Sequence, residues 1–209
     1  MDLLSEVWLP TLNWQPSPSE VTKFNELYDQ VLRGNKVTNL TRITTPIDFW
    51  EKHLWDSLRG IKPLWHQTNL RVIDVGTGAG FPGLPCAIVH ESWQLTLLDG
   101  TLKKIRFINS VIEALGIINA IGVHGRAEEI AHENFYKNQY DLVLIRAVGS
   151  VAECLKYSLP LTRSGGTIVL YRGQWLKEEE QLLEGMKWYR ENFVTPISQG
   201  QRNCIYITT

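Results

Sequence analysis

From residue 70 onward, short runs rich in β-branched residues alternate with amphipathic stretches, and this alternation limits the folds open to the chain. Strand–helix alternation predicts a parallel sheet with helices on both faces. Two last runs have no long helix between them, so we expect an antiparallel hairpin at the sheet edge. The expected strands cover 71–75, 94–98, 120–124, 140–145, 167–171, 193–197 and 204–208, and clear helical patterns cover 103–115 and 151–159.

Residues 1–65 have a different, helical rhythm. Ser17 and Glu20 have the spacing of a capping box, and Gly34 is the expected stop of that helix. Thr45-Pro46 begins a second helix, which Gly60 ends. We therefore expect an N-terminal helical extension (1–65), packed through its tryptophans onto an α/β domain (66–209).

Composition narrows the class of protein. The 209 residues are 44% hydrophobic and 21% charged, with a net charge of −1, which excludes wholesale disorder and a surface that coats polyanions. No apolar run approaches a membrane span, and the start lacks the basic region of a signal peptide. Cys86, Cys154 and Cys204 form neither a disulfide framework nor a zinc pattern, so we expect a cytoplasmic protein without a metal.

The sharpest feature is the glycine-rich segment after the first expected strand, Asp74-x-Gly76-x-Gly78-x-Gly80. Ligands bind at the carboxyl ends of such strands, and Asp99, which ends the next strand, suits ribose hydroxyls. The D-x-G-x-G form is typical of S-adenosylmethionine (SAM) dependent methyltransferases, with the strand carboxylate supporting the loop and contacting the cofactor. A G-x-G-x-x-G match begins only at Gly78, in the wrong register for NAD, although NAD and a purely structural turn remain alternatives.

The chain resembles the bacterial 16S ribosomal RNA guanine-N7 methyltransferases, also called the glucose-inhibited division protein B family. Four separated segments carry the resemblance, in order along nearly the whole chain. They are Asn35-Lys36-x-x-Asn39-Leu40-Thr41, His53-x-x-Asp56-Ser57, the segment 74–83 with Leu97-Leu98-Asp99, and Arg146-Ala147. Arg172-Gly173 stands where the family usually has Lys-Gly.

The resemblance implies a class I SAM-dependent methyltransferase (Rossmann-like) fold, with a mostly parallel seven-stranded sheet and an antiparallel edge. It also implies the cofactor-binding residues Asp74, Gly76, Gly78, Gly80, Phe81, Asp99, Thr101, Ala127, Glu128 and Arg146. Arg146 would be the residue beside the transferred methyl group. His53 and Asp56 would form a hydrogen-bonded pair near the cofactor, and a metal on that pair is the less favoured alternative.

Methylation of guanine N7 needs positioning rather than a general base, because N7 carries a free lone pair and no proton. An arginine suits guanine O6, a phosphate or the carboxylate of SAM, and the sequence leaves these open for Arg146. The segment after Arg146 lacks the Asn/Asp-Pro-Pro-aromatic loop of amino-group methylation. Cys86 is expected in a buried helix rather than as a nucleophile.

The expected partner is small-subunit ribosomal RNA within the assembled particle, bound by a monomer. Candidate RNA contacts are Asn35, Lys36, Arg42 and Arg172, while a solvated helix face is the alternative for basic groups such as Lys103, Lys104 and Arg106. A methyltransferase acting on a small molecule or protein, and a SAM- or RNA-binding module without activity, are the alternative functions.

Overall fold

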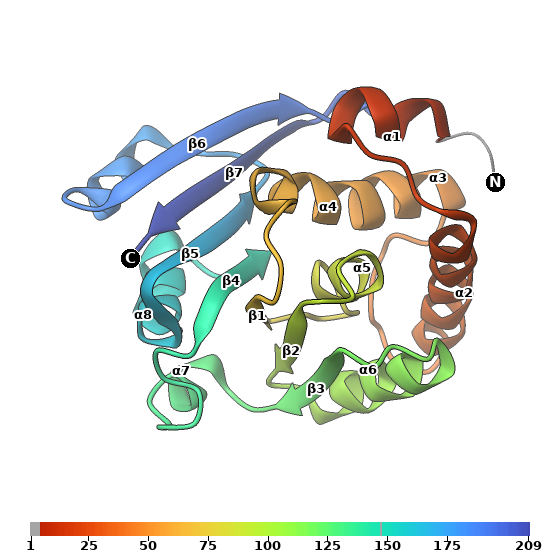
Figure 1. The fold of residues 1–209 in the computed structure, drawn as a ribbon, viewed down its shortest axis with the longest axis horizontal. Helices are drawn as coiled ribbons and strands as arrows, with labels where there is room; N and C mark the ends of the chain where they lie inside the picture. The colour runs from red at the N-terminus through yellow and green to blue at the C-terminus, as the bar shows by residue number, and fades with distance from the viewer. Residues whose placement is uncertain (1–4, 147) are drawn as a thin grey trace.

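A seven-stranded sheet forms the centre of the computed structural model, which describes residues 5–146 and 148–209 (Figure 1). The strands follow the order β3-β2-β1-β4-β5-β7-β6. The first five are parallel, and β7 runs antiparallel to both β5 and β6. Their bounds are β1 (Arg71–Val75), β2 (Gln94–Asp99), β3 (Ala120–His124), β4 (Tyr140–Arg146), β5 (Thr162–Arg172), β6 (Lys187–Val194) and β7 (Gln201–Thr208). The predicted α/β class, parallel sheet and antiparallel edge are confirmed.

The predicted strand at 193–197 was wrong, because β6 spans Lys187–Val194. This strand lies at the edge of the sheet, and all of its side chains are half-buried or exposed, so no apolar run marks it. Pro196 lacks the N–H that would extend the ladder. β5 also begins five residues earlier than predicted, at Thr162, because Gly165 and Gly166 disguise its start.

Helices cover both faces of the sheet (Figure 1). Alternate residues of a strand point to opposite faces, and in β1 Val72 packs into one core while Ile73 and Val75 pack into the other. The N-terminal segments with α5 and α6 cover the first face, and α7, α8 and η4 cover the second. The covering elements are α1 (Ser5–Leu12), α2 (Pro18–Asn35), α3 (Pro46–Phe49), η2 (Trp50–Trp55), α4 (Asp56–Ile61), η3 (Lys62–Leu64), α5 (Gly83–Val89), α6 (Leu102–Ala114), α7 (Ala127–Ile130), α8 (Val151–Leu161) and η4 (Lys177–Leu183).

The N-terminal extension is held by aromatic packing. Trp8 lies against Trp50 at a centroid distance of 5.9 Å and stacks on Phe24 at 6.4 Å. Trp8, Trp50 and Trp55 are each 2% exposed, which confirms the predicted packing role of these tryptophans. Because the same core includes side chains from the sheet, residues on both sides of position 65 share it; the boundary at 65/66 stays a prediction.

The two predicted N-terminal helices differ in how regular they are. The Ser17 capping box is present: Ser17 Oγ accepts from the Glu20 amide at 3.3 Å, and the Ser17 amide donates to Glu20 Oε2 at 2.6 Å. The second helix, predicted over 45–60, is interrupted by the π-helical stretch η2. Side-chain donors compete for carbonyls there, since Ser57 Oγ donates to the His53 carbonyl and Arg146 to that of Lys52. Wide turns of this kind are frequent at functional sites.

Within the described ranges, no helix is both long and apolar enough to cross a membrane. Cys86 lies fully buried in α5, as predicted for a structural thiol.

Candidate active site

The carboxyl ends of three neighbouring parallel strands meet at one edge of the sheet. β1 lies between β2 and β4, so the parallel register brings the ends of β1, β2 and β4 together (Figure 1). Asp74 lies near the end of β1, and Asp99 and Arg146 end β2 and β4. Parallel pairing therefore brings together groups that are up to 72 positions apart.

Asp74 organises the glycine loop from beneath. One carboxylate oxygen, Oδ2, accepts from the Thr77 hydroxyl at 2.7 Å and from the Gly83 amide at 2.8 Å. The other oxygen, Oδ1, is buried and has no hydrogen-bond partner among the described residues. Burial raises the pKa of Asp74 to about 6 from 3.8, against the lowering effect of these two hydrogen bonds. The carboxyl group thus has an unused acceptor.

The loop itself needs glycine. Gly76, Gly78 and Gly80 have φ angles of +71°, +60° and +99°, which residues with a Cβ rarely adopt. A Cβ on Gly76 would also lie 2.5 Å from Val148 Cγ2. The predicted reason for the glycines, a tight turn after β1, is therefore present in the backbone.

Asp99 joins the glycine loop to the segment after β2. Its Oδ2 accepts from the Gly78 amide at 3.0 Å, its Oδ1 accepts from the Thr101 amide at 2.8 Å, and Lys104 Nζ lies 3.5 Å from Oδ2. Since each carboxylate oxygen can accept about two hydrogen bonds, Asp99 keeps acceptor capacity for a ligand. It is 7% exposed and borders a cavity.

This smaller cavity, of about 180 Å³, lies between three segments. The end of β1, the end of β2 and the start of α7 each contribute residues, and Val148 and Tyr157 close it. Among the predicted cofactor residues, those that border it are Gly76, Asp99, Thr101, Ala127 and Glu128. Burial raises the pKa of Tyr157 well above its ordinary value, so its hydroxyl stays neutral.

Phe81 lies beside the smaller cavity's lining residues in the chain but packs toward the N-terminal helices, and its contact with the cofactor stays a prediction. It is 3% exposed, lies outside the lining of the smaller cavity and stacks on His53 at a centroid distance of 4.2 Å. The Arg146 guanidinium lies 5.7 Å from the same ring. Phe81 therefore connects the glycine loop to the N-terminal helices.

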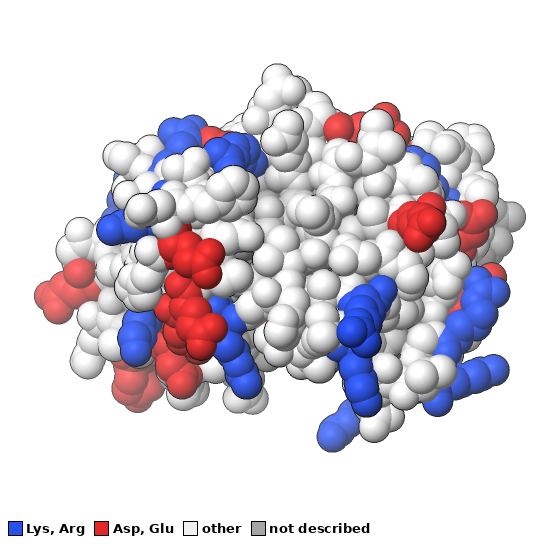
Figure 2. Space-filling model, turned by 90° about the horizontal axis from the view of Figure 1, so that it is seen from below, with Lys and Arg blue, Asp and Glu red and all other residues white. Residues whose placement is uncertain are grey.

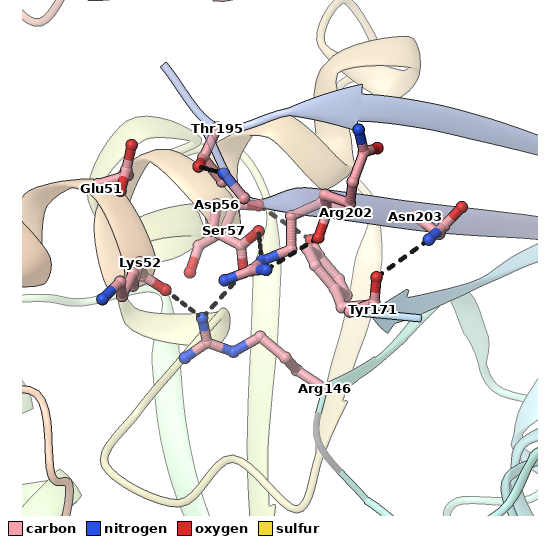
Figure 3. Close-up of polar contacts among 12 residues, drawn as sticks. Glu51, Lys52, Asp56, Ser57, Arg146, Tyr171, Thr195, Arg202 and Asn203 are labelled. Atoms are coloured by element: carbon pink, nitrogen blue, oxygen red, sulfur yellow. Dashed lines mark hydrogen bonds and ion pairs between the residues drawn. The ribbon is translucent and has the colours of Figure 1, made fainter. Parts of the chain in front are cut away.

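Arg146 is held by residues about 90 positions earlier in the chain. Its Nη1 donates to the Lys52 carbonyl at 2.8 Å and to Asp56 Oδ2 at 3.3 Å, and its Nη2 lies 3.1 Å from His53 Nδ1. Figure 3 shows Arg146 reaching from the end of β4 to the helix that carries Lys52 and Asp56. Three of the five guanidinium N–H groups are used, which leaves Nε–H and one Nη2–H for a ligand.

A larger cavity, of about 580 Å³, opens beside Arg146. Cationic side chains from four segments border it, together with polar groups of η2, α4 and β7. The lining includes Ile43, Lys52, His53, Asp56, Arg146, Tyr171, Arg172, Gly173, Gln174, Arg202 and Asn203. Arg202 Nε lies 3.7 Å from Asp56 Oδ1, so Asp56 lies between two arginines (Figure 3). Burial raises the pKa of Asp56, and the two arginines oppose that shift.

Residues 20–204 match the family model described as rRNA small subunit methyltransferase G. The chain belongs to this family.

Curated relatives agree over nearly the full length. The "Ribosomal RNA small subunit methyltransferase G" of Thermosynechococcus vestitus is 48% identical, covering 96% of this chain and 92% of its own. The protein of the same name from Trichormus variabilis is 47% identical, covering 98% and 88%.

Solved structures show the fold alone, because their identities are low. A SAM-dependent methyltransferase from Aquifex aeolicus superposes with a TM-score of 0.60 at 15% identity, covering 86% of this chain and 98% of its own. TYW2 of M. jannaschii in complex with AdoMet superposes with a TM-score of 0.56 at 12% identity, covering 73% and 74%. The predicted class I methyltransferase fold is confirmed.

The candidate RNA residues of this family member lie in different settings. Lys36 and Arg42 are exposed on the loop after α2, whereas Asn35 Oδ1 accepts from the backbone amides of Leu40 and Thr41 at 2.8 and 3.0 Å. Arg172 borders the larger cavity, but it also pairs with Glu179 at 2.8 Å.

Figure 2 shows the face seen from the β3 side, where acidic side chains gather on the left between basic ones, and further basic side chains stand out on the right. This face presents no single basic field. Among residues 5–146 and 148–209, no group of three or more His, Cys, Asp or Glu is arranged to hold a metal ion. Ala147, part of the family motif with Arg146, lies outside the described residues.

Several residues at the site were not predicted from the sequence, above all Arg202 and Asn203. β7 is antiparallel to β5 and pairs Arg172 with Asn203, so it starts at the edge where the parallel strands end. The first residues of such a returning strand are the available signal. It was missed because the strand was predicted to begin only at Cys204.

Proposed function

We propose that the chain transfers a methyl group from SAM to N7 of one guanine in small-subunit ribosomal RNA. The observation that carries the proposal is the position of Arg146. It ends β4 beside the larger cavity, on the same sheet edge as the cavity that Asp99 borders. The names of the relatives, which are ribosomal RNA small subunit methyltransferases, support the substrate.

The residues at the smaller cavity fit SAM. Asp99 has free acceptor capacity for the ribose hydroxyls, and the segment around Ala127 and Glu128 borders the place for adenine. Asp74 lies beneath the glycine loop, outside the lining of this cavity, and its unpartnered Oδ1 would be the acceptor for the cationic amino acid end. When bound, SAM supplies a methyl group that its sulfonium already activates.

The side chains then have to orient the base rather than move a proton. Guanine O6 lies beside N7 and accepts hydrogen bonds, and Arg146 keeps two N–H donors for it. Because burial and the charge of Arg146 lower the pKa of His53 to about 3, the imidazole is neutral and adds no charge beside the base. Fixed geometry of this kind lowers the barrier by reducing the entropy lost at the reaction step.

The assembled small subunit is the substrate that we propose, with the chain acting as a monomer in the cytoplasm. Lys52, Arg146, Arg172 and Arg202 surround the larger cavity and suit phosphates near the target base. The net charge is −1, so long-range attraction to naked RNA is weak.

Transfer of labelled methyl from SAM tests the proposal. Small subunits lacking N7-methylguanine and naked RNA are compared, and chain cleavage specific for N7-methylguanine locates the product. We expect one cleavage site on the subunit, and loss of transfer by Arg146→Ala with SAM still bound. Incorporation without cleavage would refute the N7 chemistry, and SAM binding without incorporation would refute the substrate.

A further inference from the structure

His53, in the π-helical stretch η2, lies where this stretch meets the glycine loop and the end of β4. Its ring is 6% exposed and stacks on Phe81 with an interplanar angle of 3°. Phe49 meets the ring edge-on, with the centroids 5.4 Å apart. These two phenyl rings fix the plane of the imidazole, and therefore the directions in which its nitrogens point.

Both ring nitrogens have partners, and the partners define the tautomer. Arg146 Nη2, which lies 3.1 Å from Nδ1, can only donate, so Nδ1 accepts. The proton is therefore on Nε2, which lies 3.0 Å from Thr41 Oγ1 and donates to it. Loss of the Thr41 acceptor would leave the Nε2–H group without its hydrogen-bond partner, but the proton would stay on Nε2. A proton on Nδ1 would point at the donor of Arg146.

Thr41 is itself fixed by the loop that follows α2. Its hydroxyl oxygen also accepts from the Ile43 amide at 3.0 Å, and its own amide donates to Asn35 Oδ1. Lys36 and Arg42 lie exposed on this same loop. The hydrogen bonds therefore run without a gap from the loop with the candidate RNA contacts, through Thr41 and His53, to Arg146.

We propose that Thr41 and His53 are positioning residues, which align Arg146 for methyl transfer and couple it to the loop 36–42. The inference rests on the proposed function. Arg146 has a long, flexible side chain, and the bonds to Lys52 and Asp56 hold only its Nη1. The imidazole fixes the second nitrogen and thereby the plane of the guanidinium. A displacement of the guanidinium by about 1 Å can lower the rate of methyl transfer by about a hundredfold in such a site.

Thr41→Val is the decisive variant, because it keeps the side-chain shape and removes the hydroxyl. We expect kcat to fall by roughly tenfold or more, with KM for the RNA substrate and SAM affinity near wild type, as for lost alignment. Thr41→Ser should restore kcat. Thr44→Val is the matched control: Thr44 is exposed, and its hydroxyl forms none of the hydrogen bonds found in the described part of the chain.

The nitrogen-15 signals of His53, assigned by their loss in His53→Asn, give a readout without turnover. We expect a protonated Nε2 in wild type, Thr41→Ser and Thr41→Val, because Arg146 keeps Nδ1 as an acceptor. In Thr41→Val the Nε2–H signal should shift, because its hydrogen bond to Thr41 is lost. An unshifted Nε2–H signal in Thr41→Val, an unchanged kcat, or a rise in KM alone would overturn the proposal. If wild type methylates no small-subunit RNA, the proposed function fails, and the nitrogen signals still test the coupling independently.

Discussion

The buried imidazole of His53 makes a quantitative prediction about stability and pH. Burial, with a contribution from the charge of Arg146, lowers its pKa from 6.5 to about 3. As the pH falls through about 6.5, His53 takes up a proton in the unfolded chain but not in the folded one. The folded state therefore loses stability between about pH 6.5 and pH 3. At about pH 4.5 the loss is two pH units at 1.36 kcal/mol each, or about 2.7 kcal/mol.

His53→Asn removes this contribution. As the pH is lowered, the free energy of unfolding of the variant should therefore fall less steeply than that of wild type. We expect the difference in unfolding free energy between wild type and the variant to change by about 2.7 kcal/mol, in favour of the variant, from about pH 7.5 to pH 4.5. Other shifted groups cancel because both chains contain them, including His90, with a pKa lowered to about 4 by burial, and Asp74.

Urea unfolding followed by the fluorescence of the eight tryptophans measures these free energies at each pH. His132→Asn is the control, since His132 is exposed, and it should follow wild type. Parallel pH profiles for wild type and His53→Asn would refute the reasoning, because they would mean that folding does not exclude the proton from His53.

Three further changes test other parts of the site. Asp99→Asn keeps one acceptor oxygen but loses the charge, and SAM affinity measured by calorimetry should fall about tenfold; an unchanged affinity would remove Asp99 from the ribose site. Gly83→Ala places a Cβ 1.9 Å from Leu97 Cδ2 and should cost about 2 kcal/mol of unfolding free energy in urea. Glu51→Ala leaves the backbone amides of residues 197 and 198 without their acceptor and should cost about 3 kcal/mol, whereas Glu51→Gln retains an acceptor oxygen and should cost less. Equal losses in the two Glu51 variants would contradict that account.

The sequence by itself determined the parts of this protein that follow from local chemistry. A capping box, three glycines with positive φ and alternating apolar runs are readable because each depends on a few neighbouring residues. The parallel order of strands then required Asp74 and Asp99 to end near one another. The meeting of Asp74 and Asp99 at one edge of the sheet was therefore predictable from the sequence, and their contact with SAM stays a prediction.

The tertiary structure decided the parts that depend on distant partners. The bounds of β6 were predicted wrongly because an exposed edge strand buries no regular face. β7 begins earlier than predicted, and its antiparallel pairing with β5 brings Arg202 to the site. The π-helical stretch exists where Arg146 and Ser57 compete for helix carbonyls, one of them from a strand about 90 positions away. The neighbours of Arg146 thus depend on contacts between segments far apart in the chain, which no local pattern encodes.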